Sequence, residues 1–571
     1  MKTKYLNIRL LIGIILSMFG GLCGIFIPII LKEYIDNIKS IHTIRDIYYI
    51  IFLFIAQTIL TTFGTYLTSI VGEGYVATYR TNLFKHLLYL PTTFFDDTKS
   101  GELASRIVND TATIRNFVTV ALPNFITSLV VFFGSVTALF LLDWKLSTLM
   151  IILLLMLSLI ILPLSKILGK YSKMNQNGIS KLTGLISEVF SQVRLIKSEV
   201  AEKDTELRQQ KQVTEIYNIS IKADLIRAII NPIVFLFLFG MIAIVFGYGG
   251  ARVNEGTLTI GTLISFLVYL FQILNPTNAI INFSNEYNTM RGATEKLKEL
   301  LLVPAEFAKN KTSDVVNLED LNGNLVLHNV NFSYGKNKIL KNLSMTIKPF
   351  QKTAIVGPSG AGKTTILTIL NRIYPVKDGK ITINNKNINN FNIYDWRRRF
   401  AVVLQEPEVL SGTIKENLEF GLDYKPLKRD LELALKKAFL IDDVRKMPNG
   451  IDTNIGEKGV KLSGGQLQRL QIAKVFLKNP EIILLDEATA NLDSNSENYI
   501  EKSLGINFAN KRIVVVAHRL ATIIDADIIY FIENGIISGV GTHKELFEKH
   551  KMYKKYVLEQ FYKEKDRTEE E

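Results

Sequence analysis

Six long stretches without a single charged side chain constrain this chain more than any other feature. They cover residues 10–31, 47–72, 116–142, 146–165, 228–251 and 256–285. An α-helix needs about 20 predominantly apolar residues to cross the hydrocarbon core of a bilayer, and each stretch is long enough. The sequence therefore predicts six membrane-spanning helices in the first half of the chain.

The connections between these stretches alternate between long and short. The long ones cover residues 73–115 and 166–227, and the short ones 32–46, 143–145 and 252–255. The long connections carry charge but keep apolar residues at helical spacing, as in Leu182, Ile186 and Val189. We therefore expect the spanning helices to continue well beyond the membrane on one side. Because six crossings return the chain to the side on which it started, both termini are expected on that side as well.

Charge and cysteine content exclude several classes of protein. An ion-coupled carrier is disfavoured, because such proteins usually place an ionisable residue inside the membrane and the six stretches contain none. The net charge of +13 fits an excess of basic residues on cytoplasmic segments, where they attract anionic lipid. Without an aromatic-rich basic stripe, it does not indicate a nucleic-acid partner. Cys23 is the only cysteine, which excludes an intrachain disulfide.

A phosphate-binding loop appears in a second region, which begins near residue 321 and alternates short β-rich runs with helices. An apolar strand at 353–356 precedes the loop and a helix at 363–373 follows it. The loop consists of Gly357, Pro358, Ser359, Gly360, Ala361, Gly362, Lys363 and Thr364, with Thr365 next. Its glycines let backbone N–H groups approach phosphates, Lys363 reaches the β and γ phosphates, and Thr364 can ligate Mg²⁺. The expected ligands are ATP and Mg²⁺, and since ATP is cytosolic, both termini and this region are placed in the cytoplasm.

Two further strands of this region end in polar side chains. The strand at 482–485 ends in Asp486 and Glu487, and the strand at 513–516 leads to His518. Strand ends of this kind meet at the ligand-binding edge of a parallel sheet. We expect Asp486 to bind Mg²⁺, Glu487 to act as general base on the attacking water, and His518 to contact the γ-phosphate.

The segment Leu462-Ser463-Gly464-Gly465-Gln466, followed by a helix-like run at 467–477, gives the region a specific likeness. Here the chain resembles an ATP-binding cassette (ABC) transporter of the exporter type, and the resemblance covers essentially the whole chain. It implies an all-α polytopic membrane domain of six helices with long cytoplasmic extensions, followed by an α/β P-loop NTPase domain. In that family this pentapeptide is the signature motif, whose serine and glycines bind the γ-phosphate of ATP held by the opposite subunit.

The resemblance also assigns roles to single residues. Tyr334 is similar to the aromatic that stacks on adenine, and Gln405 to the residue that links the Mg²⁺ and water site to the membrane domain. Asp493 is similar to a loop aspartate that communicates between the two sites. His518 resembles the switch histidine. Residues 456–459 are similar to a loop that touches the cytoplasmic helices, and residues 95–103 and 180–197 resemble the two regions with coupling helices.

The expected domain boundaries follow from these features. They are a transmembrane domain at 1–305, a linker at 306–322, an ATPase domain at 323–562 and a charged, disordered tail at 563–571.

One chain offers one phosphate loop and one signature, so the resemblance implies a working unit of two chains and two ATP. The implied function is ATP-driven export of an amphipathic or hydrophobic drug, lipid or peptide across the cytoplasmic membrane by alternating access. Glu487, Ser463 and His518 all fit the active pattern, which favours a homodimer and leaves a heterodimer open. A soluble ABC ATPase is excluded by the six spans. An ATP-gated channel or membrane-bound sensor remains as the alternative, and the Lys, Ile and Asn richness points to a bacterial source.

Overall fold

A computed structural model describes residues 2–37, 43–98, 100–306, 315–486, 505, 507–508, 510–517 and 519–570. Packing divides the chain into two units. One, which we call the helical unit, comprises Met1–Lys85 and Gly101–Leu302, and the other, the α/β unit, comprises His86–Ser100 and Val303–Glu571. The boundary at 302 lies close to the predicted end of the transmembrane domain at 305. The assignment of His86–Ser100 to the α/β unit was not predicted.

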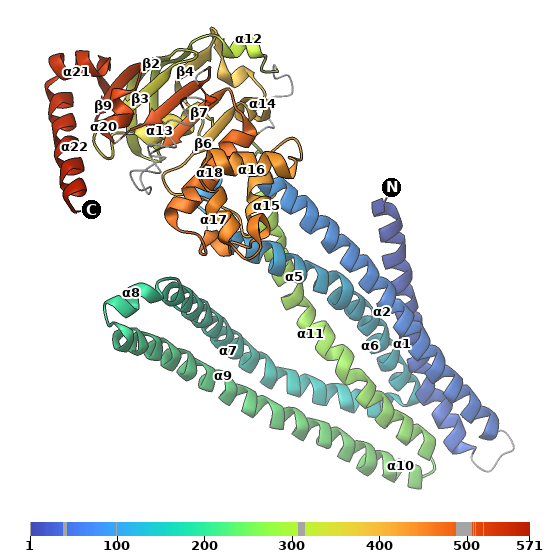
Figure 1. Ribbon diagram of the computed structural model, residues 1–571. Helices are drawn as coiled ribbons and strands as arrows, with labels where there is room; N and C mark the ends of the chain where they lie inside the picture. Colours follow the sequence, from blue (N-terminus) through green and yellow to red (C-terminus); the bar gives the residue numbers. More distant parts are fainter. Residues whose placement is uncertain are drawn as a thin grey trace. The chain divides into compact units, whose positions relative to one another are not determined.

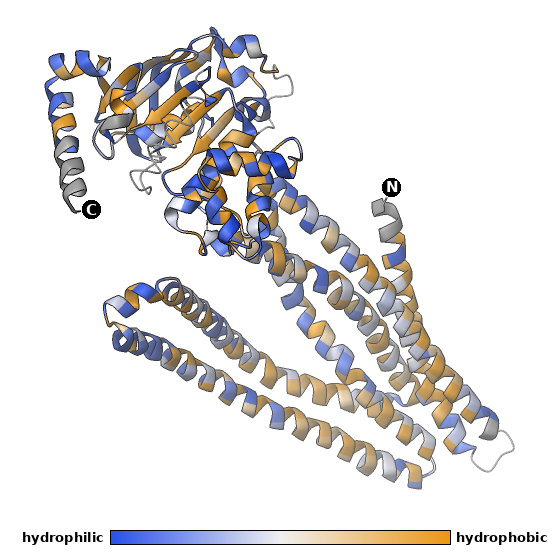
Figure 2. Cartoon of the chain, viewed as in Figure 1, coloured by the Kyte–Doolittle hydropathy of each residue, from blue (hydrophilic) through white to orange (hydrophobic). Residues whose placement is uncertain are grey.

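The described part of the helical unit contains six helices that are long and apolar enough to cross a membrane, which confirms the six predicted spans (Figures 1 and 2). They are α1 (Lys2–Asp36), α2 (Thr43–Leu88), the continuous run α4 (Ser100–Ser105), α5 (Thr111–Asn116) and α6 (Leu122–Leu142), then α7 (Trp144–Ser191), the run α9 (Glu202–Ile244) and α10 (Gly250–Asn254), and α11 (Ile260–Leu302). Three π-helical turns complete the two runs, namely Arg106–Asp110, Phe117–Ala121 and Val245–Gly249.

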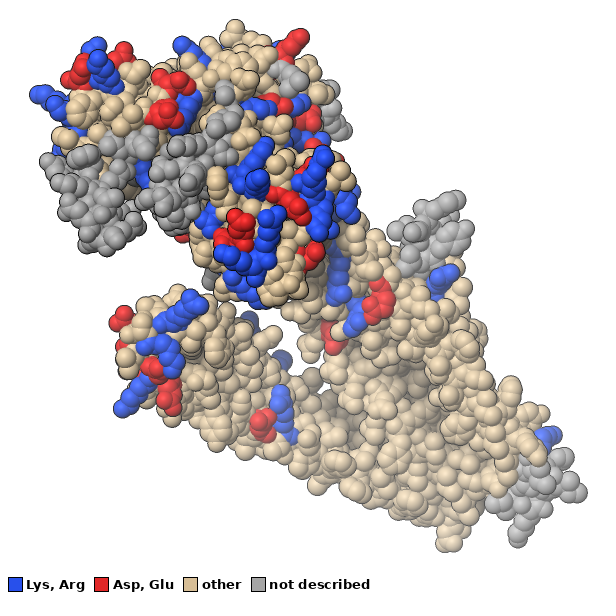
Figure 3. Space-filling view, viewed as in Figure 1, with Lys and Arg blue, Asp and Glu red and all other residues tan. Residues whose placement is uncertain are grey.

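The predicted helical extensions beyond the membrane are present. Helix α2 continues to Leu88 and α7 to Ser191, far past the apolar stretches that begin them. Helices α7 and α9 pack side by side and are joined at their tip by the short helix α8 (Val193–Ser198) (Figure 1). Charged side chains gather around this tip, while the spanning parts are almost free of them (Figure 3).

Close backbone contact holds α1 against α2. Gly13 and Gly64 face each other, and a Cβ atom built on Gly64 would lie 2.7 Å from the carbonyl oxygen of Gly13 and would also collide with Ser17. Small residues at such positions let two membrane helices approach closely, where dispersion contacts replace the missing hydrophobic driving force. The pair is therefore a fixed point of the helical unit.

Hydrogen bonds join α1 to α11 inside the membrane. Ser265 donates to the carbonyl oxygen of Pro28 at 2.6 Å, and the Tyr269 hydroxyl donates to that of Ile25. Pro28 lacks the N–H that would bond the carbonyl oxygen four residues earlier, and the two side-chain bonds reach the backbone of this same part of α1. These bonds place α1 and α11 in register.

The ends of the helices away from α8 are tied by carboxylates. Asp143 accepts from the backbone N–H of Leu146 at 2.8 Å, which caps α7, and from Arg252 Nη1 at 2.6 Å. Asp36 accepts from the Thr259 hydroxyl at 2.7 Å. These contacts link the α6–α7 connection to α10, and the end of α1 to the start of α11.

Two sheets form the α/β unit. The antiparallel sheet has the order β2-β1-β4-β5, and the second sheet has the order β10-β9-β3-β8-β7-β6. In the second sheet, β10 is antiparallel to β9 and the other neighbours are parallel. The strands are β1 (Leu325–Tyr334), β2 (Asn337–Ile347), β3 (Lys352–Val356), β4 (Asp378–Ile383), β5 (Lys386–Asn387), β6 (Phe400–Val403), β7 (Ile482–Asp486), β8 (Arg512–Val516), β9 (Ile528–Glu533) and β10 (Ile536–Gly541).

Continuous apolar sequence explains the parallel sheet. Strands β7 and β8 are buried along their whole length, as expected for strands covered by helices on both faces. The covering helices and the other helices of the unit are α3 (Thr92–Asp96), α12 (Leu318–Leu321), α13 (Lys363–Leu370), α14 (Ile393–Arg398), α15 (Ile414–Glu419), α16 (Lys428–Lys437), α17 (Ile441–Lys446), α18 (Gly464–Lys478), α20 (Leu520–Ile524), α21 (His543–Lys549) and α22 (Lys551–Glu570). The predicted strands at 353–356, 482–485 and 513–516 are confirmed.

Two predictions about helix ends are wrong. The helix after the phosphate loop ends at Leu370 instead of residue 373, because Arg372 takes a left-handed conformation with φ of 55° that an α-helix cannot continue through. The segment 563–571 was expected to be disordered, but α22 extends through it to Glu570. Its Lys, Glu and Arg residues are good helix formers, and their high charge does not prevent a helix.

Candidate nucleotide site

The carboxyl ends of parallel strands bring the predicted site residues to one edge of the sheet. Strand β8 lies between β3 and β7, and Val516 pairs with both Ile355 and Asp486. Neighbouring strands lie about 4.8 Å apart, so the end of β3 and Asp486 are separated by roughly 10 Å. This span suits a triphosphate with a bound cation between the loop after β3 and the carboxylate after β7.

Glycines shape the loop between β3 and α13. Gly357 has φ of 154° and Gly362 has φ of 96°, which are conformations that side-chain-bearing residues rarely adopt. A Cβ atom on Gly357 would also collide with the carbonyl oxygen of Ile532 on β9, and one on Gly362 would lie 2.7 Å from Leu340. The loop is therefore packed against β2 and β9, and it leads directly into the N-terminus of α13.

Lys363 points back into this loop. Its Nζ atom donates to the carbonyl oxygens of Gly357 at 2.8 Å and Pro358 at 2.9 Å, so the ammonium group lies inside the curve of the backbone. A positive charge and the free N–H groups of a helix N-terminus both attract phosphate. Thr364 is exposed at the first turn of α13, whereas the side chain of Thr365 is buried against the core.

Two more of the predicted residues lie at the same edge. Asp486 is only 3% exposed at the end of β7, and Gln405 follows β6, the neighbour of β7. Glu487, Asp493 and His518 lie outside the described residues, so their positions and roles stay predictions from the sequence.

Tyr334 ends strand β1 with 38% of its surface exposed. Its ring packs edge to face on Phe332, with centroids 4.9 Å apart, and on Tyr374, with centroids 5.1 Å apart. The aromatic predicted to stack on adenine therefore belongs to a cluster of three rings.

The signature residues begin a helix in another part of the unit. Ser463 is the N-cap of α18: its hydroxyl accepts from the N–H of Gln466 at 3.2 Å, and its own N–H donates to Gln466 Oε1 at 3.0 Å. This capping box leaves Ser463 and Gly464 exposed at the helix N-terminus. Helix α18 packs on α15, α16 and β6, whereas α13, behind the phosphate loop, packs on β7 and β8. One chain thus presents two separate helix N-termini, each of which could attract an anion.

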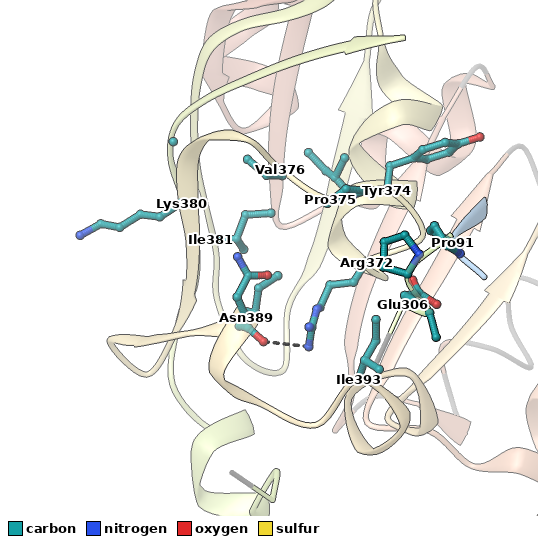
Figure 4. Close-up of a pocket in the computed structure, with 15 residues that line it drawn as sticks. Pro91, Glu306, Arg372, Tyr374, Pro375, Val376, Lys380, Ile381, Asn389 and Ile393 are labelled. Atoms are coloured by element: carbon teal, nitrogen blue, oxygen red, sulfur yellow. Dashed lines mark hydrogen bonds between the residues drawn. The ribbon is translucent and has the colours of Figure 1, made fainter. Parts of the chain in front are cut away.

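An ion pair near the C-terminal end of α13 was not predicted from the sequence. Arg397 holds the Glu306 carboxylate with both terminal nitrogens, at 3.0 and 2.6 Å, and Arg372 lies next to it. The pKa of Arg372 is lowered to about 10, mainly by burial and also by the neighbouring charge of Arg397, while Glu306 opposes the shift. Glu306 and Arg372 line a cavity of about 260 Å³ together with Pro91 (Figure 4). The partners are about 90 residues apart, so no local pattern reveals them.

The segment 86–100 is anchored to the α/β unit at several points. The backbone N–H of Glu306 donates to the carbonyl oxygen of Tyr89 at 2.8 Å, and His86 Nε2 lies 3.1 Å from the carbonyl oxygen of Val303. Asp96 accepts a hydrogen bond from the Tyr374 hydroxyl at 2.9 Å. The connection between the second and third spans therefore contacts Val303, Glu306 and Tyr374, of which Tyr374 packs on Tyr334.

Comparison with known proteins gives the same result along the whole chain. Residues 10–277 match the model of the ABC transporter transmembrane region, and residues 340–490 match that of the ABC transporter ATPase domain. A multidrug resistance ABC transporter ATP-binding and permease protein of Lactococcus lactis subsp. lactis is 35% identical over 98% of this chain and 94% of its own length. An ATP-dependent lipid A-core flippase of Syntrophus aciditrophicus is 31% identical over 91% of this chain and 86% of its own.

A solved structure of a bacterial Atm1-family ABC exporter with ATP bound superposes with a TM-score of 0.81, covering 97% of this chain and 98% of that one at 23% identity. This likeness concerns the fold. Together with the relatives and the motifs at the sheet edge, it fixes the family. The chain belongs to the ABC transporter family, as a half-transporter of the exporter type that joins one multi-pass membrane region to one ATPase domain.

Proposed function

We propose that two copies of this chain form a homodimer with two composite ATP sites, and that it exports an amphipathic or hydrophobic substrate. The observation that carries the proposal is the division of the α/β unit into two exposed anion-binding surfaces, the loop at Lys363 and the helix N-terminus at Ser463. Each surface alone would leave much of a triphosphate in water. Two antiparallel copies would close each loop with the signature of the other.

In one half of such a site, adenine stacks on Tyr334 and the phosphates lie in the loop. Lys363 neutralises the β and γ phosphates, and the N-terminus of α13 adds its dipole. Mg²⁺ in nucleotide sites is held by phosphate oxygens, water and one or two protein oxygens. The exposed Thr364 hydroxyl and the carboxylate of Asp486 are hard oxygen ligands of this kind at the same sheet edge, with Gln405 beside them. The cation would neutralise charge that develops on the transferred phosphoryl group.

In the other half, the partner's signature helix binds the γ-phosphate. Ser463 and the N–H groups of the following glycines would donate to phosphate oxygens, as helix N-termini commonly do. Glu487 would accept a proton from the attacking water while the bond between water oxygen and γ-phosphorus forms and the bond to the β-phosphate oxygen breaks. Departure of phosphate removes contacts made only in the closed dimer, which lets the two copies separate.

The hairpin of α7 and α9 supports a dimer as well. Its tip around α8 exposes large apolar side chains in the single chain, namely Phe190, Val193, Leu195 and Val200. Apolar side chains on a charged, water-facing tip favour burial against a protein surface. We propose that this tip docks on the α/β unit of the second copy and transmits its closure to the membrane.

The substrate class follows from the membrane helices and the relatives. The six spanning stretches carry no charged side chain, which suits an uncharged or amphipathic molecule and membrane lipid itself. The relatives are named as a multidrug resistance transporter and a lipid A-core flippase, which supports a drug or a lipid as the proposed cargo. An ATP-gated channel would use the same ATPase machinery. Uptake of a fluorescent lipid or dye into inside-out vesicles against its gradient separates the two, because a channel only equilibrates its solute.

Cross-linking between copies tests the composite site. In a background with Cys23→Ala, one tagged copy carries Ser359→Cys and a differently tagged copy carries Ser463→Cys. We expect a disulfide between the two tags when ATP is present. The control pair, Ser359→Cys with Ser344→Cys on β2, should not cross-link. Absence of the first product, together with full ATPase activity of a monomer isolated in nanodiscs, contradicts the proposal. ATPase activity of the chain expressed alone distinguishes a homodimer from a heterodimer.

A further inference from the structure

Helix α3 makes contact with the aromatic cluster around Tyr334 through one side chain. Tyr374 donates from its hydroxyl to Asp96 at 2.9 Å, and its ring lies edge to face on Tyr334 with centroids 5.1 Å apart. It also packs against Phe332, whose ring centroid lies 5.8 Å away. Tyr374 therefore touches both the expected adenine platform and the connection between the second and third spans.

The backbone holds Tyr374 rigidly in this place. It follows the left-handed turn at Arg372, whose guanidinium donates to the carbonyl oxygens of Ile388 at 2.9 Å and Phe391 at 3.0 Å. The next residue, Pro375, restricts Tyr374 to extended conformations. The turn also ends α13, the helix that begins at the phosphate loop, so loop and tyrosine lie at opposite ends of one short helix.

The hydroxyl of Tyr374 is a donor over the whole physiological pH range. Burial raises its pKa to about 12, and the hydrogen bond to Asp96 adds to the shift. A neutral phenol beside a carboxylate donates a charge-assisted hydrogen bond, which is stronger than one between neutral groups. The Tyr374 hydroxyl therefore stays protonated, and its hydrogen bond to Asp96 breaks only if one of the two residues moves.

We propose that Tyr374 is a positioning residue that couples the stacking of adenine on Tyr334 to the position of Asp96 in helix α3. The proposal rests on the proposed role of Tyr334. The ring of Tyr374 fixes the orientation in which Tyr334 meets the base, and its hydroxyl transmits that orientation to the membrane connection. Because such coupling is reciprocal, a displaced α3 weakens adenine binding by the same factor.

Four variants, made in the full-length chain in nanodiscs, separate the role of the Tyr374 ring from that of its hydroxyl. Tyr374→Phe keeps the ring and removes the hydroxyl, whereas Tyr374→Leu removes both. Tyr334→Leu removes the platform itself. The matched control is Tyr424→Phe, which removes the hydroxyl that donates to the carbonyl oxygen of Leu477 at 2.8 Å elsewhere in the same unit. Unfolding temperatures near that of Tyr424→Phe show that a variant is folded.

Affinity for a fluorescent ATP analogue tests the ring. Loss of base stacking should weaken binding about 5- to 100-fold in Tyr334→Leu. We expect a smaller loss in Tyr374→Leu, of several-fold, and a change within twofold in Tyr374→Phe. Tripolyphosphate, which has no base, should bind all variants alike. If Tyr334→Leu binds ATP normally, the adenine platform of the proposed function is wrong. If Tyr334→Leu binds ATP weakly but Tyr374→Leu binds it normally, only the inference about Tyr374 fails.

Hydrogen exchange measured by mass spectrometry tests the hydroxyl. In the unmodified chain and in Tyr424→Phe, ATP should slow exchange in the peptide covering residues 86–98, and tripolyphosphate should do so much less. In Tyr374→Phe this protection should disappear while protection of residues 357–365 persists. Asp96→Ala should behave in the same way, and the double variant should be no worse than either single one. Protection of residues 86–98 that persists in Tyr374→Phe overturns the inference.

Discussion

The α/β unit and the helical unit differ in how completely one chain covers its own apolar surface. In the α/β unit the residues of both sheets pack into continuous cores, and strands such as β7 and β8 are buried throughout. In the helical unit 44% of the most apolar window of α1 is buried, but only 6% of that of α2 and 11% of that of α9–α10. The α/β unit is folded by its own contacts, whereas the helical unit leaves much of its apolar surface to be covered by lipid and by the other half of a dimer.

This difference separates the residues proposed for ATP chemistry, which lie in the α/β unit, from the apolar helix surfaces that await lipid or a partner. The described residues proposed to bind ATP, such as Lys363 and Asp486, lie on a scaffold whose geometry is fixed by close packing, so their roles are tested by single substitutions in one chain. The spanning helices share a smaller buried core, and close contacts such as that of Gly13 with Gly64 and the ties at Asp143 and Asp36 help to hold them together. Four predictions test the comparison, from the largest expected effect to the smallest.

Glu487→Gln should lower the steady-state ATPase rate by about 10²- to 10⁴-fold, the usual contribution of a general base. ATP should still bind, because the amide keeps the size of the side chain and Lys363 is unchanged. Steady-state hydrolysis and binding of a fluorescent ATP analogue measure the two effects separately. A rate near that of the unmodified chain would remove the general-base role of Glu487.

Truncating equally apolar residues in the two units should have unequal effects. Leu327→Ala, at a side chain that is 0% exposed in the α/β unit, should destabilise that unit by about 2–5 kcal/mol. Leu159→Ala, at a side chain that is 73% exposed on α7, should change stability by less than about 0.5 kcal/mol.

The chain offers a reporter for each unit, since its two tryptophans are Trp144 in the helical unit and Trp396 in the α/β unit. Thermal unfolding followed by fluorescence, with Trp144→Phe or Trp396→Phe to isolate one signal, assigns each loss to its unit. Equal losses for the two leucine variants would refute the comparison.

Gly64→Ala tests the close contact between α1 and α2 in the helical unit. The added methyl group would press α1 and α2 apart, and overpacking of this kind costs about 1–3 kcal/mol. We expect a lower unfolding temperature at the Trp144 reporter and no change at Trp396. Gly240→Ala on α9 is the control, because a Cβ atom there meets no other atom within 4 Å. An undiminished unfolding temperature in Gly64→Ala would show that these helices are not fixed at this point.

Glu306→Gln should destabilise the α/β unit by about 1–2 kcal/mol, less than for a fully buried pair, because the carboxylate and Arg397 are 17% and 26% exposed. The loss of its charge leaves Arg372 and Arg397 without an opposing group. The control Asp423→Asn breaks the pair with Arg398, in which both side chains are about 60% exposed, and should change stability by less than about 0.5 kcal/mol. Trp396 fluorescence measures the unfolding of both variants. A larger loss of stability in Asp423→Asn than in Glu306→Gln would contradict the expected importance of the less exposed pair.

Local sequence was sufficient to predict the features that depend on neighbouring residues. The six spans, the strand before Gly357, the strand ending at Asp486 and the helix start at Ser463 all follow from runs of apolar residues, glycines and capping residues. These signals work because each is complete within about 20 residues. The resemblance to ABC transporters then predicted that the signature residues of one copy contribute to the ATP site of a second copy.

Contacts between distant segments were not predictable in this way. Tyr374 meets Asp96 across 278 positions, and Arg397 meets Glu306 across 91, so neither pair leaves a local pattern. The left-handed turn at Arg372 ended α13 early because tertiary hydrogen bonds hold its side chain, which overrides the helical propensity of the segment. The charged segment that follows residue 562 continues α22 as a helix, because Lys, Glu and Arg are compatible with a helix as well as with a solvated coil.

The apolar tip at α8 has a consequence for the biogenesis of the transporter. In the proposed dimer, a newly inserted copy would present the exposed Phe190, Leu195 and Val200 to the cytosol until a second copy covers them. Such surfaces are what chaperones and quality-control proteases recognise, so an orphan copy should be short-lived. Membrane abundance would then be set by the rate at which newly made copies find each other, and pulse–chase labelling at different expression levels would reveal it.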